Sequence, residues 1–61
     1  PLRGARKAAG LTQRELAEQT GIPLTLIQKL ENGKRELAKV NVAYAIRIAR
    51  ALDTTAEALF G

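Results

Sequence analysis

The chain has 61 residues, a mass of 6.6 kDa and a net charge of +4. A chain this short forms one domain at most, so residues 1–61 are expected to fold as a single unit. The absence of cysteine and histidine excludes disulfides, thiolate metal sites and the usual general base. So short a chain can hardly enclose a substrate pocket either. We therefore expect no enzyme activity, no metal and no organic cofactor.

The composition is typical of a helical protein. Eleven alanines and nine leucines against two valines favour helix over strand. No apolar run approaches the ~20 residues of a membrane span, and no signal peptide is visible. A soluble, cytoplasmic domain with no membrane partner is therefore expected. Because the chain begins at Pro1 and contains no methionine, we interpret it as a fragment or a processed product.

The charge is distributed unevenly along the chain. Residues 1–50 hold all ten basic residues and four acidic ones, a net charge of +6, whereas residues 51–61 hold only Asp53 and Glu57, a net charge of −2. A basic body attracts DNA, RNA or an anionic membrane surface. A solvated surface that merely keeps a small domain soluble has the same composition, so charge alone does not decide between these partners.

Taken in chain order, turn signals divide the chain into five short helical segments. The first runs from about Leu2 to Ala9 and ends at Gly10, a residue type common just past a helix C-terminus. The second begins with a capping box, in which the side chains of Thr12 and Glu15 each accept from the other's backbone N–H. It ends at Gly21, which supplies the positive φ of a tight turn.

The third segment begins at Pro23, a residue type that suits the first helical turn. It runs to about Glu31, where Asn32 and Gly33 stop it. All five segments are too short to be stable alone, so tertiary packing must hold them. The candidate core that would do so consists of small and aliphatic residues: Leu11, Leu16, Ile22, Ile27, Leu30, Ala45, Ile48, Ala49, Leu52 and Leu59.

The fourth and fifth segments complete the helical pattern. Asn41 is a good N-cap for a helix over Val42–Leu52, and Asp53 follows at a position where a left-handed residue is common. Thr55 caps a last helix over Ala56–Phe60. No stretch alternates with period two for long enough to form a strand. The sequence therefore predicts an all-α fold.

The most informative pattern lies within residues 12–33. Gln13 falls in the first turn of the second segment, and Ala17, four residues later, is small enough for two helices to cross closely. Gly21, four residues later again, supplies the turn. Ile27 and Leu30 then anchor the third segment against the second. These features recur at the spacing of a helix-turn-helix, which would span about residues 12–31.

Helical geometry predicts which residues of the third segment face outward. At 100° per residue, Ile27 and Leu30 fall on the core side. Thr25 can donate, accept or offer a methyl group, Gln28 suits adenine, and Lys29 suits guanine or a phosphate. The outward arc is the face that a recognition helix lays in the major groove. It comprises Leu24, Thr25, Gln28, Lys29 and Asn32.

The stretches "GLTQRELAEQTGI", "IQKLENGKR" and "IARALDTTAEALF" occur together and in order. With them the chain closely resembles the phage-repressor/Cro-type helix-turn-helix family, also called the xenobiotic-response-element type, from Arg6 to Phe60. The resemblance implies a compact five-helix bundle. It also implies that the chain binds double-stranded DNA as a homodimer and that the DNA site is a palindromic operator. It implies base reading by Leu24, Thr25 and Lys29 with Gln28 beside them, backbone contacts by Gln13 and Arg14, and phosphate contacts by Asn32, Lys34 and Arg35.

The sequence departs from the family pattern in three places. Pro23 replaces the usual Ser or Thr cap of the recognition helix, although it fixes φ for that helix. Leu24 and Leu26 stand where polar residues are common. Leu26 can lean on the core edge, whereas Leu24 is expected to be exposed and to meet either a thymine methyl or a protein. The loop expected over residues 36–40 is longer than the family's commonest form.

Two further pairs have alternative roles. Arg6 and Glu31 match a family pair, and we favour a structural role that fixes the recognition helix over a role that aims Arg6 at a phosphate. Leu59 and Phe60 either close the core or contribute to a dimer contact, and the sequence leaves both open. Two basic residues of the fourth segment are expected to be solvated charges: Arg47 and Arg50.

Together these features predict the DNA-binding domain of a bacterial or phage transcriptional regulator, such as a repressor. The main alternative is an antitoxin-like or adaptor module of the same fold, whose face around Leu24 and Leu26 binds a protein, because a fold does not fix a function. A purely structural helical module explains neither the charge distribution nor the motif.

Overall fold

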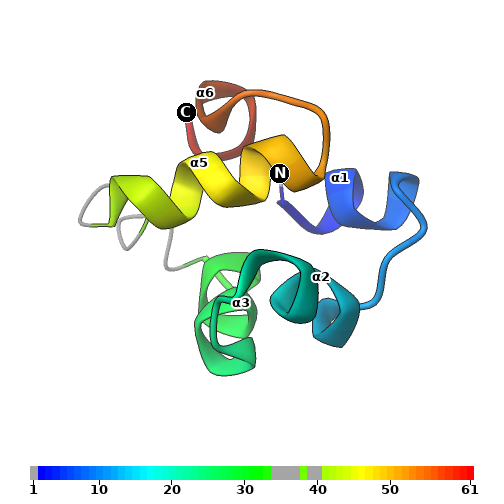
Figure 1. The fold of residues 1–61 in the computed structure, drawn as a ribbon. Coiled ribbons are helices and arrows are strands. Elements are labelled where there is room, and N and C mark those ends of the chain that lie inside the picture. The colour runs from blue at the N-terminus through cyan, green and yellow to red at the C-terminus, as the bar shows by residue number, and fades with distance from the viewer. Residues whose placement is uncertain (1, 34–37, 39–40) are drawn as a thin grey trace.

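The computed structural model describes residues 2–33, 38 and 41–61, and Figure 1 shows its fold. All regular structure within these residues is helical, which confirms the expected all-α class. The expected loop over 36–40, apart from Ala38, lies outside the described residues, as do Lys34 and Arg35. The helices are α1 (Leu2–Ala8), α2 (Gln13–Thr20), α3 (Leu24–Glu31), α5 (Val42–Ala51) and α6 (Ala56–Phe60).

The capping box predicted at the start of α2 is present. The Oγ1 atom of Thr12 accepts from the N–H of Glu15 at 3.0 Å, and Oε1 of Glu15 accepts from the N–H of Thr12 at 2.8 Å. The same hydrogen bond from the Thr12 backbone lowers the pKa of Glu15. Gly21 ends the helix with a φ of 72° while its N–H donates to the carbonyl of Ala17. This left-handed residue turns the chain directly toward α3.

The start of α3 differs from the prediction by one residue. Pro23 has a ψ of 137°, which is extended backbone, so it is the N-cap and the helix begins at Leu24. Its side chain makes no capping hydrogen bond, because proline has no polar group to offer. α1 and α5 each end one residue earlier than expected, at Ala8 and Ala51. Differences of this size are common at helix ends, which fray.

The two C-terminal helices begin as the sequence predicts. The side chain of Asn41 accepts from the N–H of Tyr44 at the start of α5, and that of Thr55 accepts from the N–H of Ala58 at the start of α6. Asp53, in the connection between them, has a φ of 55° and so takes the expected left-handed conformation. Local chemistry therefore sets where these helices begin.

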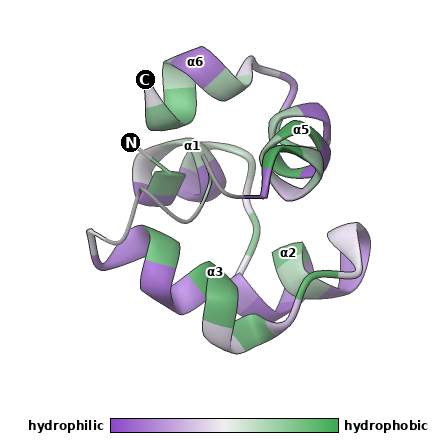
Figure 2. Ribbon diagram, turned by 90° about the vertical axis from the view of Figure 1, so that its left-hand side faces the viewer, coloured by the Kyte–Doolittle hydropathy of each residue, from purple (hydrophilic) through white to green (hydrophobic). Residues whose placement is uncertain are grey.

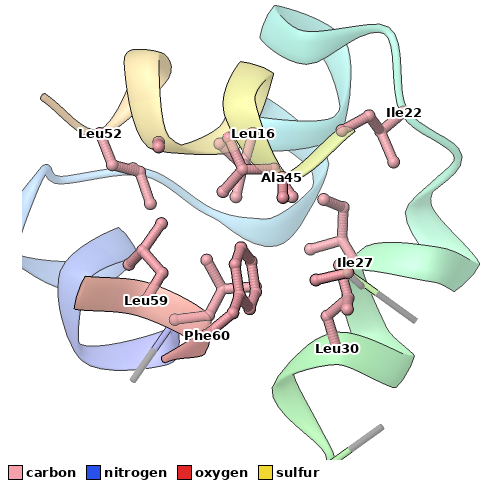
Figure 3. Close-up of a cluster of buried hydrophobic side chains, with 12 residues drawn as sticks. Leu16, Ile22, Ile27, Leu30, Ala45, Leu52, Leu59 and Phe60 are labelled. Carbon is pink, nitrogen blue, oxygen red and sulfur yellow. The ribbon is translucent and has the colours of Figure 1, made fainter. Parts of the chain in front are cut away.

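The helices pack around one cluster of apolar side chains. α2 packs against α3 and α5, α5 packs against α6, and α1 packs against α3 and α6. Leu16, Ile27 and Ile48 from three helices are fully buried at the centre. Figure 3 shows the ring of Phe60 reaching between Leu59 and the side chains of α3. The core thus connects α6 to the helix predicted to recognise DNA.

The observed core differs from the predicted core at a few residues. Leu11 is only partly buried and packs on the edge of the cluster. Leu2 and Ala38 are buried although the sequence analysis did not place them in the core, and Phe60 is 8% exposed. Leu59 is 3% exposed, so both of these α6 residues close the core.

Candidate nucleic-acid interface

α3 has a buried side and an exposed side. Ile27 and Leu30 turn into the core, where they are 0% and 4% exposed. Thr25, Gln28 and Lys29 are all exposed, and Figure 2 shows hydrophobic and hydrophilic residues alternating along this helix. The helix therefore carries hydroxyl, amide and ammonium groups on one accessible surface, which we call the α3 arc. Asn32, just past the last turn, is exposed as well.

Leu24 does not lie where the sequence analysis expected it. It is half-buried rather than exposed, because Cα–Cβ bonds tilt toward the helix N-terminus. A residue in the first turn therefore covers the backbone before the helix, which a flat helical wheel ignores. Leu26 is also half-buried and packs against the core, as expected.

Glu31, the last residue of α3, joins three parts of the molecule. Its side chain has no exposed area. Oε1 accepts from Nη2 of Arg6 at 3.1 Å and from Nε2 of Gln13 at 3.0 Å, while Oε2 accepts from Nε of Arg6. Arg6 also donates through Nη1 to the carbonyl of Leu11 at 2.7 Å. α1, the start of α2 and the end of α3 are thereby held together by one carboxylate.

The same contacts keep this carboxylate charged. Burial by itself raises the pKa of Glu31, but the hydrogen bonds from Arg6 and Gln13, with the charge of Arg6, outweigh burial and hold the pKa below its usual value. The hydrogen bond to Glu31 raises the pKa of Arg6 despite its burial. The pKa of each partner is therefore shifted in the direction that favours its charged form.

Gln13 and Arg14, in the first turn of α2, differ in their contacts: Gln13 bonds to Glu31 at the end of α3, whereas Arg14 is exposed. The amide of Gln13 is half-buried and one of its hydrogens is used by Glu31. A primary amide carries two hydrogens, and among the residues that the structure describes the Gln13 amide donates one hydrogen bond. Arg14 is exposed. Sequence reasoning missed the contact between Gln13 and Glu31 because the two residues are 18 positions apart and a single-helix wheel does not relate them.

Arg47 is exposed, as expected for a solvated charge, and it also makes two contacts that the sequence did not predict. Its Nη1 donates to the carbonyl of Thr20 at 3.3 Å, and its guanidinium lies 5.4 Å from the centre of the Tyr44 ring. Arg47 therefore links α5 to the end of α2, directly before the turn into α3. Arg50 is exposed, as expected.

Two helices joined by a tight turn, with a polar exposed arc on the second helix, define a helix-turn-helix DNA-binding fold. The family model described as helix-turn-helix matches residues 2–59. The chain belongs to this family, of the phage-repressor and Cro type, which is a family of DNA-binding domains rather than of enzymes. No curated protein and no solved structure matches the chain.

The described residues contain neither a cluster of metal ligands nor a helix that could span a membrane. None of their acidic side chains gather in the groups of three or more that could hold a metal ion. None of the helices described is long and apolar enough to cross a membrane.

Proposed function

We propose that the chain binds a specific double-stranded DNA sequence as a bacterial or phage transcriptional regulator, with α3 in the major groove. The observation that carries the proposal is the α3 arc, in which Thr25, Gln28 and Lys29 are exposed together on a helix fixed at its end by Glu31. Base recognition requires such rigidity, because a hydrogen bond to a base edge discriminates only when its donor is held in place.

The contacts divide into two classes. Arg14 and the second amide hydrogen of Gln13 bind phosphates and set the register of the domain on the duplex, with Asn32 at the other end of α3. The family resemblance adds two further phosphate contacts, at Lys34 and Arg35. Thr25, Gln28 and Lys29 read bases, and Leu24 contributes a smaller contact to a thymine methyl.

The proposed regulator acts as a homodimer in the cytoplasm. A second copy reads the other half of a palindromic operator, about one helical turn away. Repression would follow when the bound dimer occludes the promoter. This activity needs no reaction and no cofactor, in keeping with a family of DNA-binding domains.

Selection of bound duplexes from a random library tests the proposal. We expect enrichment of one palindromic sequence. Gln28→Ala should lose discrimination at one base position, by about 1–3 kcal/mol for a bidentate contact. The matched control is Gln19→Ala, since Gln19 is an exposed glutamine of α2 outside the α3 arc and its loss should leave the profile unchanged. A library that shows no enrichment would contradict the proposal.

The alternative function, a module that binds a protein through Leu24 and Leu26, has weaker support. Both side chains are half-buried, and Leu26 packs against the core. Leu24→Ala separates the two functions. If α3 reads DNA, the variant loses only a modest preference for thymine. If this face binds a protein, DNA preference is unchanged and partner capture is lost.

A further inference from the structure

The two ends of α3 are held in different ways. At its C-terminal end, Glu31 bonds to Arg6 and Gln13. At its N-terminal end, Pro23 supplies no side-chain cap, so the position of the first turn depends on the backbone that precedes it. That backbone is the turn over residues 20–23, which we call the α2–α3 turn.

Local hydrogen bonds hold the α2–α3 turn except at the carbonyl of Thr20. The N–H of Gly21 donates to the carbonyl of Ala17 at 2.9 Å, and the N–H of Ile22 donates to Oγ1 of Thr20 at 3.3 Å. The Thr20 carbonyl belongs to the last residue of α2, where the helix itself has no backbone donor to offer. Among the described residues, Arg47 on α5 supplies that donor through Nη1, at 3.3 Å.

The guanidinium of Arg47 also brings the charge that the end of α2 lacks. The C-terminus of a helix has a partial negative charge, which a nearby cation stabilises, and the last turn of α2 contains no basic residue. Arg47 lies against the turn, since a Cβ atom added to Gly21 would be 3.9 Å from its Nη1. The guanidinium is within cation–π range of the ring of Tyr44, a residue that packs against the core.

From these contacts we infer that Arg47 is a positioning residue for DNA recognition, which holds the α2–α3 turn, and thereby the first turn of α3, without touching DNA. The inference rests on the proposed function, in which Thr25 reads a base from that first turn. A hydrogen bond to a base edge requires a narrow range of distance and angle. Arg14 and Asn32 lie outside the α2–α3 turn, so their phosphate contacts do not depend on Arg47.

Arg50 provides a matched control for Arg47. Both arginines are exposed and line the same shallow hollow between α2 and α5. Within the described residues, the side chain of Arg47 donates a hydrogen bond to α2, whereas that of Arg50 makes none. Methionine at either position removes one positive charge and keeps an unbranched, flexible side chain. A difference between Arg47→Met and Arg50→Met therefore reports the contact with Thr20 and not the loss of charge.

The affinities of both variants for two duplexes, measured by fluorescence anisotropy at several salt concentrations, test the effect on recognition. For the selected half-site, Arg47→Met should bind roughly tenfold more weakly than Arg50→Met, a factor typical of losing a hydrogen bond from a charged group. For a duplex of unrelated sequence, the two variants should differ by less than about twofold, because phosphate contacts dominate that binding.

Three results of this comparison would overturn the inference. Equal affinities of the two variants for the half-site would show that the contact with Thr20 does not affect recognition. Equal losses on both duplexes would show a defect that is not specific to base reading. A flatter salt slope for Arg47→Met than for Arg50→Met would show that Arg47 contacts a phosphate itself.

Amide hydrogen exchange of the free protein tests the role of Arg47 without DNA, and so separates a failure of the inference from a failure of the proposed function. In Arg47→Met, the N–H groups of Gly21 and Ile22 should exchange roughly tenfold faster than in Arg50→Met, because the turn opens locally. The N–H of Asn32, which is hydrogen-bonded at the far end of α3, should exchange equally in both. Faster exchange at all of these amides would indicate a general loss of stability and overturn the inference, as would no change at Gly21 and Ile22.

Discussion

At the scale of single residues, Glu31 has the most unusual position. It is the last residue of α3, where the partial negative charge of the helix C-terminus disfavours a carboxylate, and its side chain has no exposed area. Arg6 and Gln13 compensate it with three hydrogen bonds. The sequence could predict the pairing of Arg6 with Glu31 through the family resemblance. It could not predict the part played by Gln13, which depends on how α2 crosses α3.

Two arginines that contact the same carboxylate should differ greatly in their effect on stability. Arg6→Ala leaves Glu31 buried without its main partner, so the free energy of unfolding should fall by about 3–5 kcal/mol. The matched variant is Arg3→Ala, because Arg3 contacts Glu31 at 3.4 Å but has a side chain that is 56% exposed. Its loss should cost less than about 1 kcal/mol. Urea denaturation measures both values, and equal losses would contradict the role assigned to Arg6.

The lowered pKa of Glu31 predicts a loss of stability in acid. The folded protein holds this group's proton less tightly than the unfolded chain does. The stability that ionised Glu31 adds to the folded protein is therefore fully present above the unfolded pKa of about 4.3. It is lost as the pH falls through the lower pKa of the folded state. Glu15, whose pKa is also lowered, adds to the same fall.

Glu31→Gln isolates the contribution of this one carboxyl group. Urea denaturation at a series of pH values between about 6 and about 2 gives the free energy of unfolding of each protein. The variant should show a shallower decline in acid than the wild type. Identical slopes for the two proteins would show that the pKa of Glu31 is the same in the folded and unfolded states.

At the scale of helices, the elements that the sequence predicts well are those with caps. Thr12, Asn41 and Thr55 each accept a hydrogen bond at the start of a helix, and capping of this kind depends only on neighbouring residues. The predicted start of α3 was wrong by one residue, because Pro23 offers no such side-chain bond. Contacts between helices, such as that of Arg47 with α2, have no local signal and become visible only in the fold.

The sequence predicts that two helices cross closely at Ala17, and we assign that crossing to α2 and α3 as a prediction to be tested. Ala17 is half-buried against the core, so Ala17→Leu should force the helices apart and cost about 1–3 kcal/mol by overpacking. In a domain of this size each kcal/mol lowers the melting temperature by about 4–8 °C. The control is Glu18→Leu at the exposed neighbouring position, which should melt close to the wild type. An unchanged melting temperature for Ala17→Leu would show that the crossing tolerates a larger residue.

At the scale of the whole molecule, composition and charge predicted a basic binding domain, and the motif predicted where on it the site lies. The alternation of buried and exposed residues along α3 followed from helical periodicity, which is why Thr25, Gln28 and Lys29 are found on an accessible surface. The exposure of two large apolar residues on α5 was not predicted. Whether Val42 and Ile46 lie inside or outside depends on how α6 folds back over α5.

The charge of the α3 arc should appear in the salt dependence of DNA binding. Each phosphate neutralised adds roughly 0.9 to the slope of log affinity against log salt concentration. Lys29→Ala should flatten that slope by about one unit while weakening binding. Arg50→Ala, measured on a duplex with a single half-site so that the second copy plays no part, should leave it unchanged. Equal slopes for Lys29→Ala and the wild type would place Lys29 away from the phosphates.

The central claim, that α3 and the start of α2 form the DNA-binding surface, is tested most directly by nuclear magnetic resonance. The uniformly ¹⁵N-labelled chain of 61 residues is titrated with the selected half-site duplex, and the change in each backbone amide shift is measured. We expect the largest changes at Gln13, at Arg14 and over residues 24–32, with small changes in α6. Changes concentrated in α5 and α6, with the amides of α3 unaffected, would contradict the account.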